Sequence, residues 1–256
     1  MSRERDLERI AAALKLADAA LQPFTPGEIE HRLKAKGDPV TDADEAVNDA
    51  LLATLPQAGE GWLSEETVDE PSRLSCHRTW IVDPVDGTKE FVKGIPEWCV
   101  SIGLVEGGDA VAGGISIPSR GLHIVGSLES GVLVNGELCR VRDHQSLDGV
   151  SVLASRSEVR RGQWERFDDA PFAVTPMGSV ACKMALVAAG LADATWTLVP
   201  KNEWDVAAGT ALVRAAGGAV WRPDGAALRF NQPKTLLPGL IAVPAGIEAA
   251  VREYLA

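Results

Sequence analysis

The chain has 256 residues, 46% of them hydrophobic and 24% charged, so it can bury a substantial core as one layered domain or two smaller ones. Its formal net charge of −11 argues against a general nucleic-acid binder, and no apolar run approaches the roughly 18 residues that cross a bilayer. The N-terminal residues lack the apolar core of a secretory signal, so we expect a cytoplasmic protein with neither a nucleic-acid nor a membrane partner.

The first part of the chain predicts two helices and then a series of strands. Apolar residues recur at helical spacing over residues 3–21 and again after Thr41, which with Asp44 is typical of a capping box. Residues 28–37 are charged and predict a short helix or a loop. Strand-like runs follow at 80–82, 98–105, 110–117, 122–127, 131–134 and 137–142. Because tight turns such as Asn135-Gly136 join these runs, they predict an antiparallel sheet.

Strands and helices alternate in the rest of the chain. Strand-like runs occur at 150–153, 171–175, 192–198, 219–221 and 240–243. Helical patterns lie between them at 156–167, 179–190 and 205–216. Such alternation is typical of a sheet covered by helices. We therefore predict a layered α/β protein of two halves, an N-terminal α+β half at 1–145 and a C-terminal α/β half at 146–256.

Acidic residues stand at the ends of three predicted elements. The pair Glu65-Glu66 follows a short apolar pair, Asp83 and Asp86 follow a predicted strand, and Asp205 opens a helix. Mg²⁺ prefers oxygen ligands and takes only a few carboxylates, leaving positions for water and substrate phosphate. Carboxylates on separate elements can converge on such an ion without a long flexible loop. The three clusters therefore indicate a metal site.

The segment Asp83-Pro84-Val85-Asp86-Gly87 carries the most information. In an extended strand the carboxylates of Asp83 and Asp86 would lie on opposite faces, roughly 10 Å apart. Pro84 fixes one φ angle and Gly87 permits a positive φ, so a sharp bend can bring the two acids together. Two adjacent anions would repel each other unless a cation lay between them. The alternative is an ordinary solvated turn, since Asp, Pro and Gly all favour turns.

This motif and its neighbours resemble the inositol monophosphatase superfamily of metal-dependent, lithium-sensitive phosphatases. The match consists of residues 80–88 with Phe91, and of segments 39–44, 63–66, 178–179, 204–209 and 216–218. These motifs occur in the family's order and extend from about residue 36 to 243. The resemblance implies an αβαβα sandwich with an antiparallel N-terminal sheet and a mixed C-terminal sheet. It also implies a phosphate-monoester hydrolase whose partner is a small phosphorylated metabolite, and family members are often homodimers.

The resemblance also implies roles for individual residues. Two or three Mg²⁺ ions would be held by Glu65, Asp83, the Val85 carbonyl, Asp86 and Asp205. The attacking water would be prepared by Asp44, Thr88 and Glu65. The substrate would contact Gly87, Thr88, Lys89, Gly178, Ser179 and Asp205. Most metal ligands thus belong to the N-terminal half, whereas Asp205 and the specificity residues belong to the C-terminal half.

The choice of substrate depends on two places in the sequence. Residues 86–91 look like the 3'(2'),5'-bisphosphate nucleotidase branch, in which Lys89 would meet a second phosphate, although a solvated surface lysine is the alternative. Leu198 stands where animal inositol enzymes carry an acid that binds an inositol hydroxyl, and residues 201–203 differ from the Gly-Pro-Thr type of the nucleotidases. We predict hydrolysis of the 3'-phosphate of adenosine 3',5'-bisphosphate. Inositol 1-phosphate or a related sugar or polyol phosphate is the alternative substrate.

Two further interpretations compete with this one. Haloacid-dehalogenase phosphatases carry a similar Asp-x-Asp-Gly-Thr motif whose first Asp is a nucleophile, but here two residues separate Asp83 from Asp86. In those phosphatases the motif also lies on a first strand near the N-terminus, whereas here it begins at residue 83. The other interpretation is a non-catalytic metal- or metabolite-binding protein on the same scaffold. The chain argues against it by retaining every acid that the hydrolytic site requires.

Overall fold

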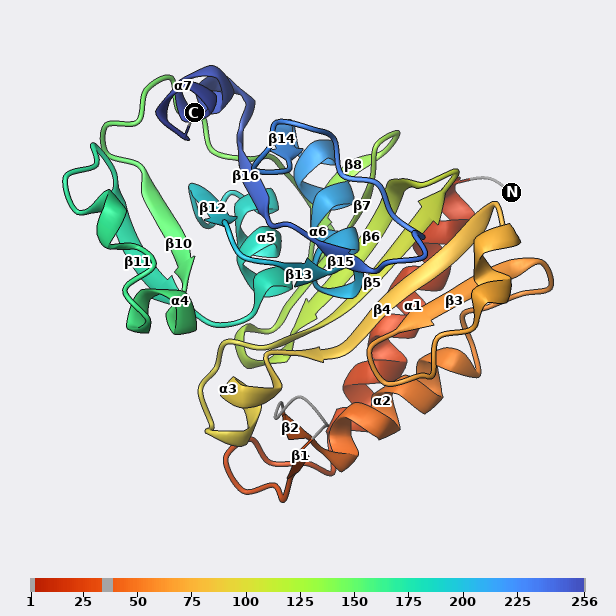
Figure 1. The fold of residues 1–256 in the computed structure, drawn as a ribbon. Coiled ribbons are helices and arrows are strands. Elements are labelled where there is room, and N and C mark those ends of the chain that lie inside the picture. The colour runs from red at the N-terminus through yellow and green to blue at the C-terminus, as the bar shows by residue number, and fades with distance from the viewer. Residues whose placement is uncertain (1–2, 34–38, 256) are drawn as a thin grey trace.

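The computed structural model describes residues 3–33 and 39–255, which form helices, two large sheets and two short strand pairs (Figure 1). In this part of the chain the α-helices are α1 (Arg3–Leu21), α2 (Asp42–Leu52), α3 (Thr88–Val92), α4 (Arg156–Arg160), α5 (Val180–Ala188), α6 (Glu203–Ala215) and α7 (Glu248–Leu255). Short 3-10 helices lie at η1 (Pro71–Ser75), η2 (Pro118–Arg120), η3 (Glu165–Phe167) and η4 (Ala245–Ile247).

The larger sheet is a meander to which one parallel strand is added. In spatial order its strands are β3 (Glu60–Ser64), β4 (Arg78–Asp86), β5 (Cys99–Glu106), β6 (Asp109–Ile117), β7 (Leu122–Ser127), β8 (Gly131–Val134) and β9 (Glu137–Cys139). Neighbours from β4 to β9 are antiparallel, as predicted. Strand β3 pairs with β4 in parallel, because the crossover at 65–77 carries the chain back to the end at which β3 began.

The smaller sheet is mixed, as predicted. In spatial order its strands are β11 (Ala173–Met177), β10 (Ser151–Ser155), β12 (Ala194–Thr197), β16 (Leu240–Pro244) and β14 (Gly218–Trp221). Strand β10 is parallel to both of its neighbours, whereas β16 is antiparallel to both of its own. The two short pairs are β1 (Arg32–Leu33) with β2 (Pro39–Val40), and β13 (Lys201–Asn202) with β15 (Leu236–Leu237).

Three apolar cores hold the layers together. Helices α1 and α2 cover one face of the larger sheet, and α5 and α6 lie between the two sheets (Figure 1). The third core lies on the other face of the smaller sheet, where Trp164, Phe167, Phe172 and Trp196 pack their rings together beside α7. This order of layers confirms the predicted αβαβα sandwich.

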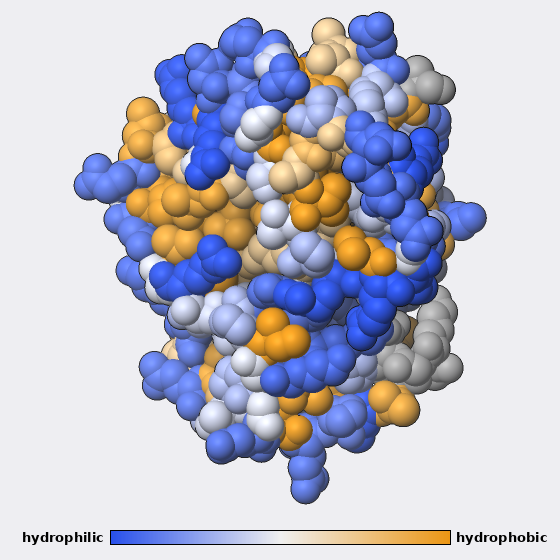
Figure 2. All heavy atoms as spheres, turned by 90° about the vertical axis from the view of Figure 1, so that its left-hand side faces the viewer, coloured by the Kyte–Doolittle hydropathy of each residue, from blue (hydrophilic) through white to orange (hydrophobic). Residues whose placement is uncertain are grey.

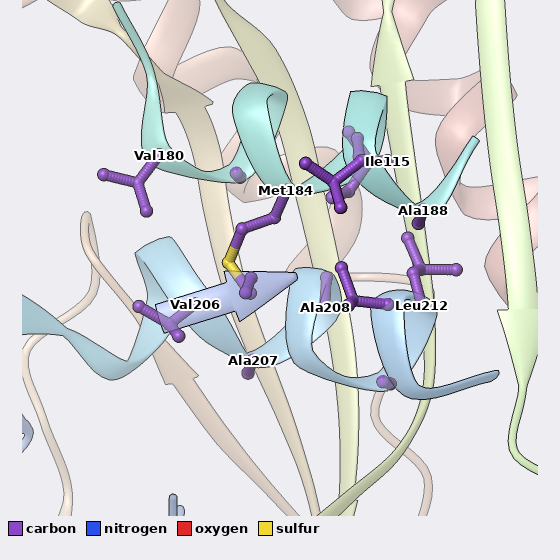
Figure 3. Close-up of a cluster of buried hydrophobic side chains, with 14 of the residues drawn as sticks. Ile115, Val180, Met184, Ala188, Val206, Ala207, Ala208 and Leu212 are labelled. Carbon is purple, nitrogen blue, oxygen red and sulfur yellow. The ribbon is translucent and has the colours of Figure 1, made fainter. Parts of the chain in front are cut away.

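Small residues let α6 approach both of its neighbours closely. On the sheet side, a Cβ atom added to Gly113 would lie 2.7 Å from the carbonyl oxygen of Ala208, and one added to Gly103 would lie 2.9 Å from the Cβ of Ala207. On the other side, Met184 of α5 reaches towards α6 (Figure 3) and fills the space left by Gly209. Because these small residues bring the backbones nearly into contact and leave no room for displacement, the middle of α6 has a fixed position over the larger sheet.

Local sequence signals account for several element boundaries. The Thr41 hydroxyl accepts the backbone N–H groups of Ala43 and Asp44, while the Asp44 carboxylate accepts the Thr41 N–H, which completes the predicted capping box. Asn135 and Gly136 both have positive φ angles, 50° and 91°, and join β8 to β9 as a two-residue hairpin turn. These boundaries follow from turn and cap chemistry alone.

Other elements differ from the prediction. The helix predicted over 156–167 is instead a single turn, α4, followed by η3, because Gly162 has a positive φ and ends the helical path. The C-terminal helix α7 was not among the predicted elements, although Ile247 and Val251 are buried one turn apart. Within the charged segment 28–37 the structure has β1, and positions 34–37 lie outside the described residues.

The surface has the mixed character of an acidic globular protein. Figure 2 shows hydrophilic side chains across the middle of the face that lies to the left in Figure 1, with an apolar area above them. Among the helices that the structure describes, none is both long and apolar enough to cross a membrane.

Candidate active site

An irregularity near the end of β4 brings its two acids to the same pocket. Asp83 lies opposite Ser101 and Asp86 opposite Cys99, so three steps along β4 match two along β5. Such a bulge adds one residue and turns side chains that would lie on opposite faces towards the same side. Gly87 follows with a φ of 100°, and a Cβ atom there would lie 2.8 Å from the Glu97 carbonyl oxygen. The predicted bend is therefore confirmed, and it requires glycine.

Three carboxylates from three segments converge beside this bend. Oxygen atoms of Glu65, Asp83 and Asp205 all lie within 4.8 Å of one another. Glu65 comes directly after β3, whose parallel pairing places Ser64 opposite Val82, next to Asp83. Asp205 is the third residue of α6. Residues separated by 140 positions in the chain thus meet at one point.

The electrostatics of this group fit a divalent cation. Burial raises the pKa of Asp83 well above its ordinary value, and the neighbouring carboxylates, Glu65 first among them, raise it further. Burial likewise raises the pKa of Asp205, with added repulsion from Asp86 and Glu65. Carboxylates that repel one another in a buried pocket, and that offer only oxygen donors, form the ligand set that a hard ion such as Mg²⁺ selects.

Asp86 lies in the same pocket but outside this group of three. Its Oδ2 atom accepts the Ser179 hydroxyl at 2.7 Å and the Ala181 N–H at 2.5 Å. Burial raises the pKa of Asp86, although these two hydrogen bonds and the nearby Lys183 oppose the rise. Ser179 also caps α5 by accepting the Cys182 N–H, so Asp86 is tied to the start of that helix.

Thr88 and Asp44 form a hydrogen-bonded pair beside these acids. The Thr88 hydroxyl lies 3.0 Å from Oδ1 of Asp44 and 3.0 Å from the Val85 carbonyl oxygen. Since a hydroxyl has a single hydrogen, it donates to one of these acceptors at a time. The other oxygen of Asp44, Oδ2, accepts from the N–H of Thr41 at 2.8 Å and its hydroxyl at 2.6 Å, so the capping box fixes this carboxylate.

These groups surround a pocket of about 410 Å³ between the two halves of the chain. One wall carries Glu65, Asp83, Asp86 and Asp205. Six cationic side chains also line the pocket: Lys89, Lys93, Arg156, Arg160, Lys183 and Lys201. The pocket reaches the carboxyl end of β10, where Ser155 ends and Arg156 follows a strand that has parallel neighbours on both sides. Ligands of α/β sheets characteristically bind at such a switch point.

Two of these cations are held in place by acidic partners. The Lys201 ammonium lies 3.2 Å from the carboxylate of the buried Glu158, which also accepts the Thr197 hydroxyl. Arg156 pairs with Glu97, whose carboxylate in turn accepts the Gly178 N–H at 2.6 Å. The pocket therefore has positive charges at defined positions as well as an acidic wall.

Comparison with known proteins decides the family. The model of the inositol monophosphatase family matches residues 3–255. The chain belongs to the inositol monophosphatase family. An inositol-1-monophosphatase of Mesorhizobium japonicum is 35% identical over 228 residues, which cover 84% of each chain. A histidinol-phosphatase of Mycobacterium tuberculosis is 36% identical over 234 residues, covering 84% of this chain and 87% of the relative.

A solved structure of the family has the same fold. CysQ from Bacteroides thetaiotaomicron superposes with a TM-score of 0.79 at 28% identity, covering 94% of this chain and 97% of that one. The match of the family model extends beyond the segment 36–243 that the motifs span, to both α1 and α7. The similarity to the family therefore includes the outer helices of the sandwich, α1 and α7.

The structure brings together the site residues predicted from the sequence. The lining of the pocket contains the following predicted residues: Glu65, Asp83, Val85, Asp86, Gly87, Thr88, Lys89, Gly178, Ser179 and Asp205. Asp44 lies behind them and contacts Thr88. Glu66 is not a lining residue, and its N–H donates to the Ser64 hydroxyl at 3.3 Å. The proposed roles of all these residues stay predictions.

Sequence reasoning missed much of the cationic wall. Arg156 and Arg160 follow β10 in the chain, and Lys183 is buried in α5 with its ammonium donating to the Ser179 carbonyl at 2.9 Å. A basic run directly after a predicted strand, at 156–161, was the available signal. This basic run could be assigned to the site only once the structure placed the carboxyl end of β10 at the same pocket as the acids.

Proposed function

We propose that this protein is a Mg²⁺-dependent phosphate-monoester hydrolase whose substrate carries a second anionic group, with adenosine 3',5'-bisphosphate as the preferred candidate. The supporting observation is that the carboxylate wall and the six cations line one pocket. Two divalent ions would largely compensate the charge of the acids. Of the six cations, Arg156 and Lys201 are paired with Glu97 and Glu158, so an anionic substrate would depend mainly on the others, Arg160 among them. The family match supports the reaction type.

The residues of the chain have distinct parts in this reaction. Glu65, Asp83, the Val85 carbonyl, Asp86 and Asp205 would hold two or three ions. The bound Mg²⁺ would supply the Lewis acidity that makes an attacking water more acidic and stabilises negative charge on the phosphate. Thr88 would accept a hydrogen bond from that water and donate its own proton to Asp44, whose orientation Thr41 fixes.

The hydrolytic water attacks phosphorus directly in this proposal. One oxygen of Asp83 already accepts the Val85 N–H at 3.1 Å, and its neighbours are other carboxylates, which suits a metal ligand better than a nucleophile. Trapping a phosphoenzyme during turnover would overturn this route and favour the aspartyl-phosphate mechanism.

The charge of the pocket bears on the rest of the substrate. The 5'-phosphate of adenosine 3',5'-bisphosphate would meet Lys89, Arg160 or Lys201, which line the pocket with the metal group. Inositol 1-phosphate has a neutral ring and makes no use of these cations. Histidinol phosphate, suggested by one relative, has a cationic amine that the same wall would repel.

A matched pair of substrates tests the proposal. Phosphate release with Mg²⁺ is measured for adenosine 3',5'-bisphosphate and for adenosine 3'-monophosphate, which lacks only the second phosphate, with inositol 1-phosphate and histidinol phosphate as comparisons. We expect the bisphosphate to have the highest kcat/KM. Equal kcat/KM values for the two nucleotides would show that a second anionic group is not required. If none of the four compounds and no other sugar phosphate releases phosphate, a non-catalytic binding protein is favoured.

Two neighbouring arginines make the test residue-specific. Arg160 and Arg161 are both exposed, but only Arg160 lines the pocket. Arg160→Gln is expected to lower kcat/KM for the bisphosphate about fivefold or more, through loss of a charge-assisted hydrogen bond, and to leave inositol 1-phosphate unaffected. Arg161→Gln serves as the control and should change kcat/KM for neither the bisphosphate nor inositol 1-phosphate. An equal effect of the two variants would argue against a specific anion subsite.

A further inference from the structure

A polar cluster built around two buried charges lies behind the pocket, where the start of α6 meets the crossover between β3 and β4. Its members are Arg73, Glu203, Asn231 and Gln232, and none of them is a lining residue of the pocket. Glu203 is fully buried and Arg73 is 2% exposed. Charged groups at such depth require partners, and here the partners come from distant segments.

Glu203 fastens the first turn of α6 to the loop that precedes β15. Its two carboxylate oxygens accept the N–H groups of Asn231 at 2.6 Å and Gln232 at 3.0 Å. Its own backbone N–H donates to the Thr235 carbonyl at 2.9 Å. Glu203 stands two residues before Asp205, so this loop holds the helical turn that carries the metal-binding carboxylate.

Arg73 fastens the same loop to the crossover. Its guanidinium donates to the Asn231 side-chain oxygen at 2.7 Å and to the Gln232 carbonyl at 3.0 Å, and it also pairs with Asp69. The Asn231 amide returns a hydrogen bond to the Arg73 carbonyl at 3.0 Å. Asn231 has a φ of 57°, a conformation in which its backbone N–H faces Glu203 while its side chain faces Arg73.

The crossover end of this cluster is packed onto β3. A Cβ atom added to Gly61 would lie 3.2 Å from the Cα of Arg73, so Arg73 rests directly on the strand that leads to Glu65. The chain of contacts thus runs from β3 through Arg73 and the 231–232 loop to Glu203 and α6. At its two ends stand Glu65 and Asp205, whose oxygens lie within 4.8 Å of each other.

We infer that Arg73 and Glu203 form a clamp that positions Glu65 and Asp205 against their mutual repulsion, so that the metal site is assembled before an ion binds. Like charges at this separation push their elements apart. Close packing fixes α6 over β5 and β6, whereas β3 is the edge strand of the sheet, and the contacts of Arg73 and Glu203 tie it to α6. Glu203 and Arg73 are positioning residues, since neither lines the pocket. The inference rests on the metal role of Glu65 and Asp205 in the proposed function.

Direct metal binding tests the clamp. Mn²⁺ is titrated into the metal-free protein by calorimetry, with Asp83→Asn as the reference for a lost metal site. In Glu203→Gln one carboxylate oxygen becomes an NH₂ group that faces a backbone N–H, so one of the two anchoring bonds is lost. We expect the Kd for Mn²⁺ to rise about tenfold or more, which is typical when outer-shell contacts of a metal site are removed. At saturating Mg²⁺, kcat should stay within threefold of wild type.

An equally buried carboxylate elsewhere provides the matched control. Asp6 on α1 is also fully buried and pairs with Arg3 and Arg78, on the far side of the larger sheet from α6. Asp6→Asn should lower the melting temperature without changing the Kd for Mn²⁺. If Glu203→Gln lowers the melting temperature but keeps a wild-type Kd, the cluster is merely structural and the clamp is refuted. If the wild type binds Mn²⁺ no better than Asp83→Asn, the proposed function fails as well.

A milder variant covers the case in which Glu203→Gln does not fold. Asn231→Gly keeps the positive φ and the backbone N–H that Glu203 accepts, but removes the side chain that Arg73 holds. We expect a smaller but measurable rise, about threefold or more, in the Kd for Mn²⁺. An unchanged Kd in this variant would show that Arg73 has no part in positioning the metal ligands.

Discussion

Asp83 has the most charged surroundings in the candidate active site. It is buried at the irregular end of β4, and the carboxylates of Glu65, Asp86 and Asp205 all act on it. Burial, and after it these neighbouring carboxylates, disfavour its ionised form and so raise its pKa well above the ordinary value. Asp83 thus destabilises the metal-free fold but is required for the proposed metal site. Removing its charge is therefore expected to stabilise the metal-free protein and to abolish activity.

The first prediction follows from this conflict. Asp83→Asn should abolish phosphate release at saturating Mg²⁺, because a metal ligand is lost. In EDTA its melting temperature should equal or exceed that of the wild type, because repulsion among the buried carboxylates is relieved. Turnover assays and thermal unfolding of the same preparations measure the two effects. Near-normal turnover in this variant would refute the metal role of Asp83.

The second prediction concerns the hydroxyl that joins water to Asp44. Thr88→Ala should lower kcat about 10²-fold or more with little change in KM, since the effect of general acid–base groups lies in this range. Thr88→Ser keeps the hydroxyl, 3.0 Å from Asp44 in the native residue, and should recover most of the rate. A kcat for Thr88→Ala within threefold of wild type would exclude the relay.

At the scale of elements, the site depends on how closely α6 approaches the larger sheet. Gly103 and Gly113 face Ala207 and Ala208, so the backbones of sheet and helix are nearly in contact. Gly113→Ala would place a methyl group 2.7 Å from the Ala208 carbonyl oxygen, which belongs to the helix backbone and cannot rotate away. We expect a loss of about 1–3 kcal/mol in the free energy of unfolding, measured with urea. Unchanged stability would mean that α6 is free to shift.

The pairing of α1 with β3 and β4 predicts a pH dependence. Burial disfavours the Glu60 carboxylate, but hydrogen bonds from Arg9 and Trp80 outweigh this and lower its pKa to about 2. A lowered pKa in the folded state gives stability that is complete above pH 4.5 and is lost as the pH falls towards 2. Glu60→Gln should therefore have a lower free energy of unfolding than the wild type at pH 7, and this difference should shrink as the pH falls from 4.5 to 2. A constant gap in urea unfolding would contradict this assignment.

At the scale of the whole molecule, the proposed metal binding would be coupled to folding. The three carboxylates come from β3, β4 and α6, so an ion can bind them together only in the folded protein. Mg²⁺ should raise the melting temperature, with a contribution of about 2.7 kcal/mol at a concentration 100 times the Kd. Because the net charge of −11 makes the protein sensitive to salt in general, NaCl of equal ionic strength is the control. A shift of the same size in NaCl, or in Asp83→Asn, would point to screening alone.

Much of the fold and site could be predicted from local sequence patterns. The capping box at Thr41, the hairpin at Asn135-Gly136 and the bend at Gly87 depend on neighbouring residues, so their chemistry is visible in the sequence. The acids of the metal group could be named because each directly follows or opens a regular element. The layered α/β architecture was predictable because the periods of helices and strands alternate in the second half.

Other features could not be predicted because they depend on contacts between distant segments. The parallel pairing of β3 and the link from Arg73 to Glu203 have no local signature. Of the six cations that line the pocket, Lys89 lies in a recognisable motif, but nothing local shows that the six come together. A basic residue after a strand is solvated in most proteins, and only packing places Arg156 opposite the acids. Substrate choice lies in this second group.

The pair Asp83 and Asp86 illustrates the division between the two kinds of information. The sequence by itself determined that the pair stands at a bend between an apolar strand and a glycine, because Pro84 and Gly87 restrict or release the backbone locally. The resemblance to the family already placed Glu65 and Asp205 beside the pair, but only the tertiary structure shows that their oxygens lie within 4.8 Å of Asp83, whereas Asp86 accepts the Ser179 hydroxyl. The physical reason is that backbone preferences act over a few residues, while the position of α6 follows from close packing between two sheets.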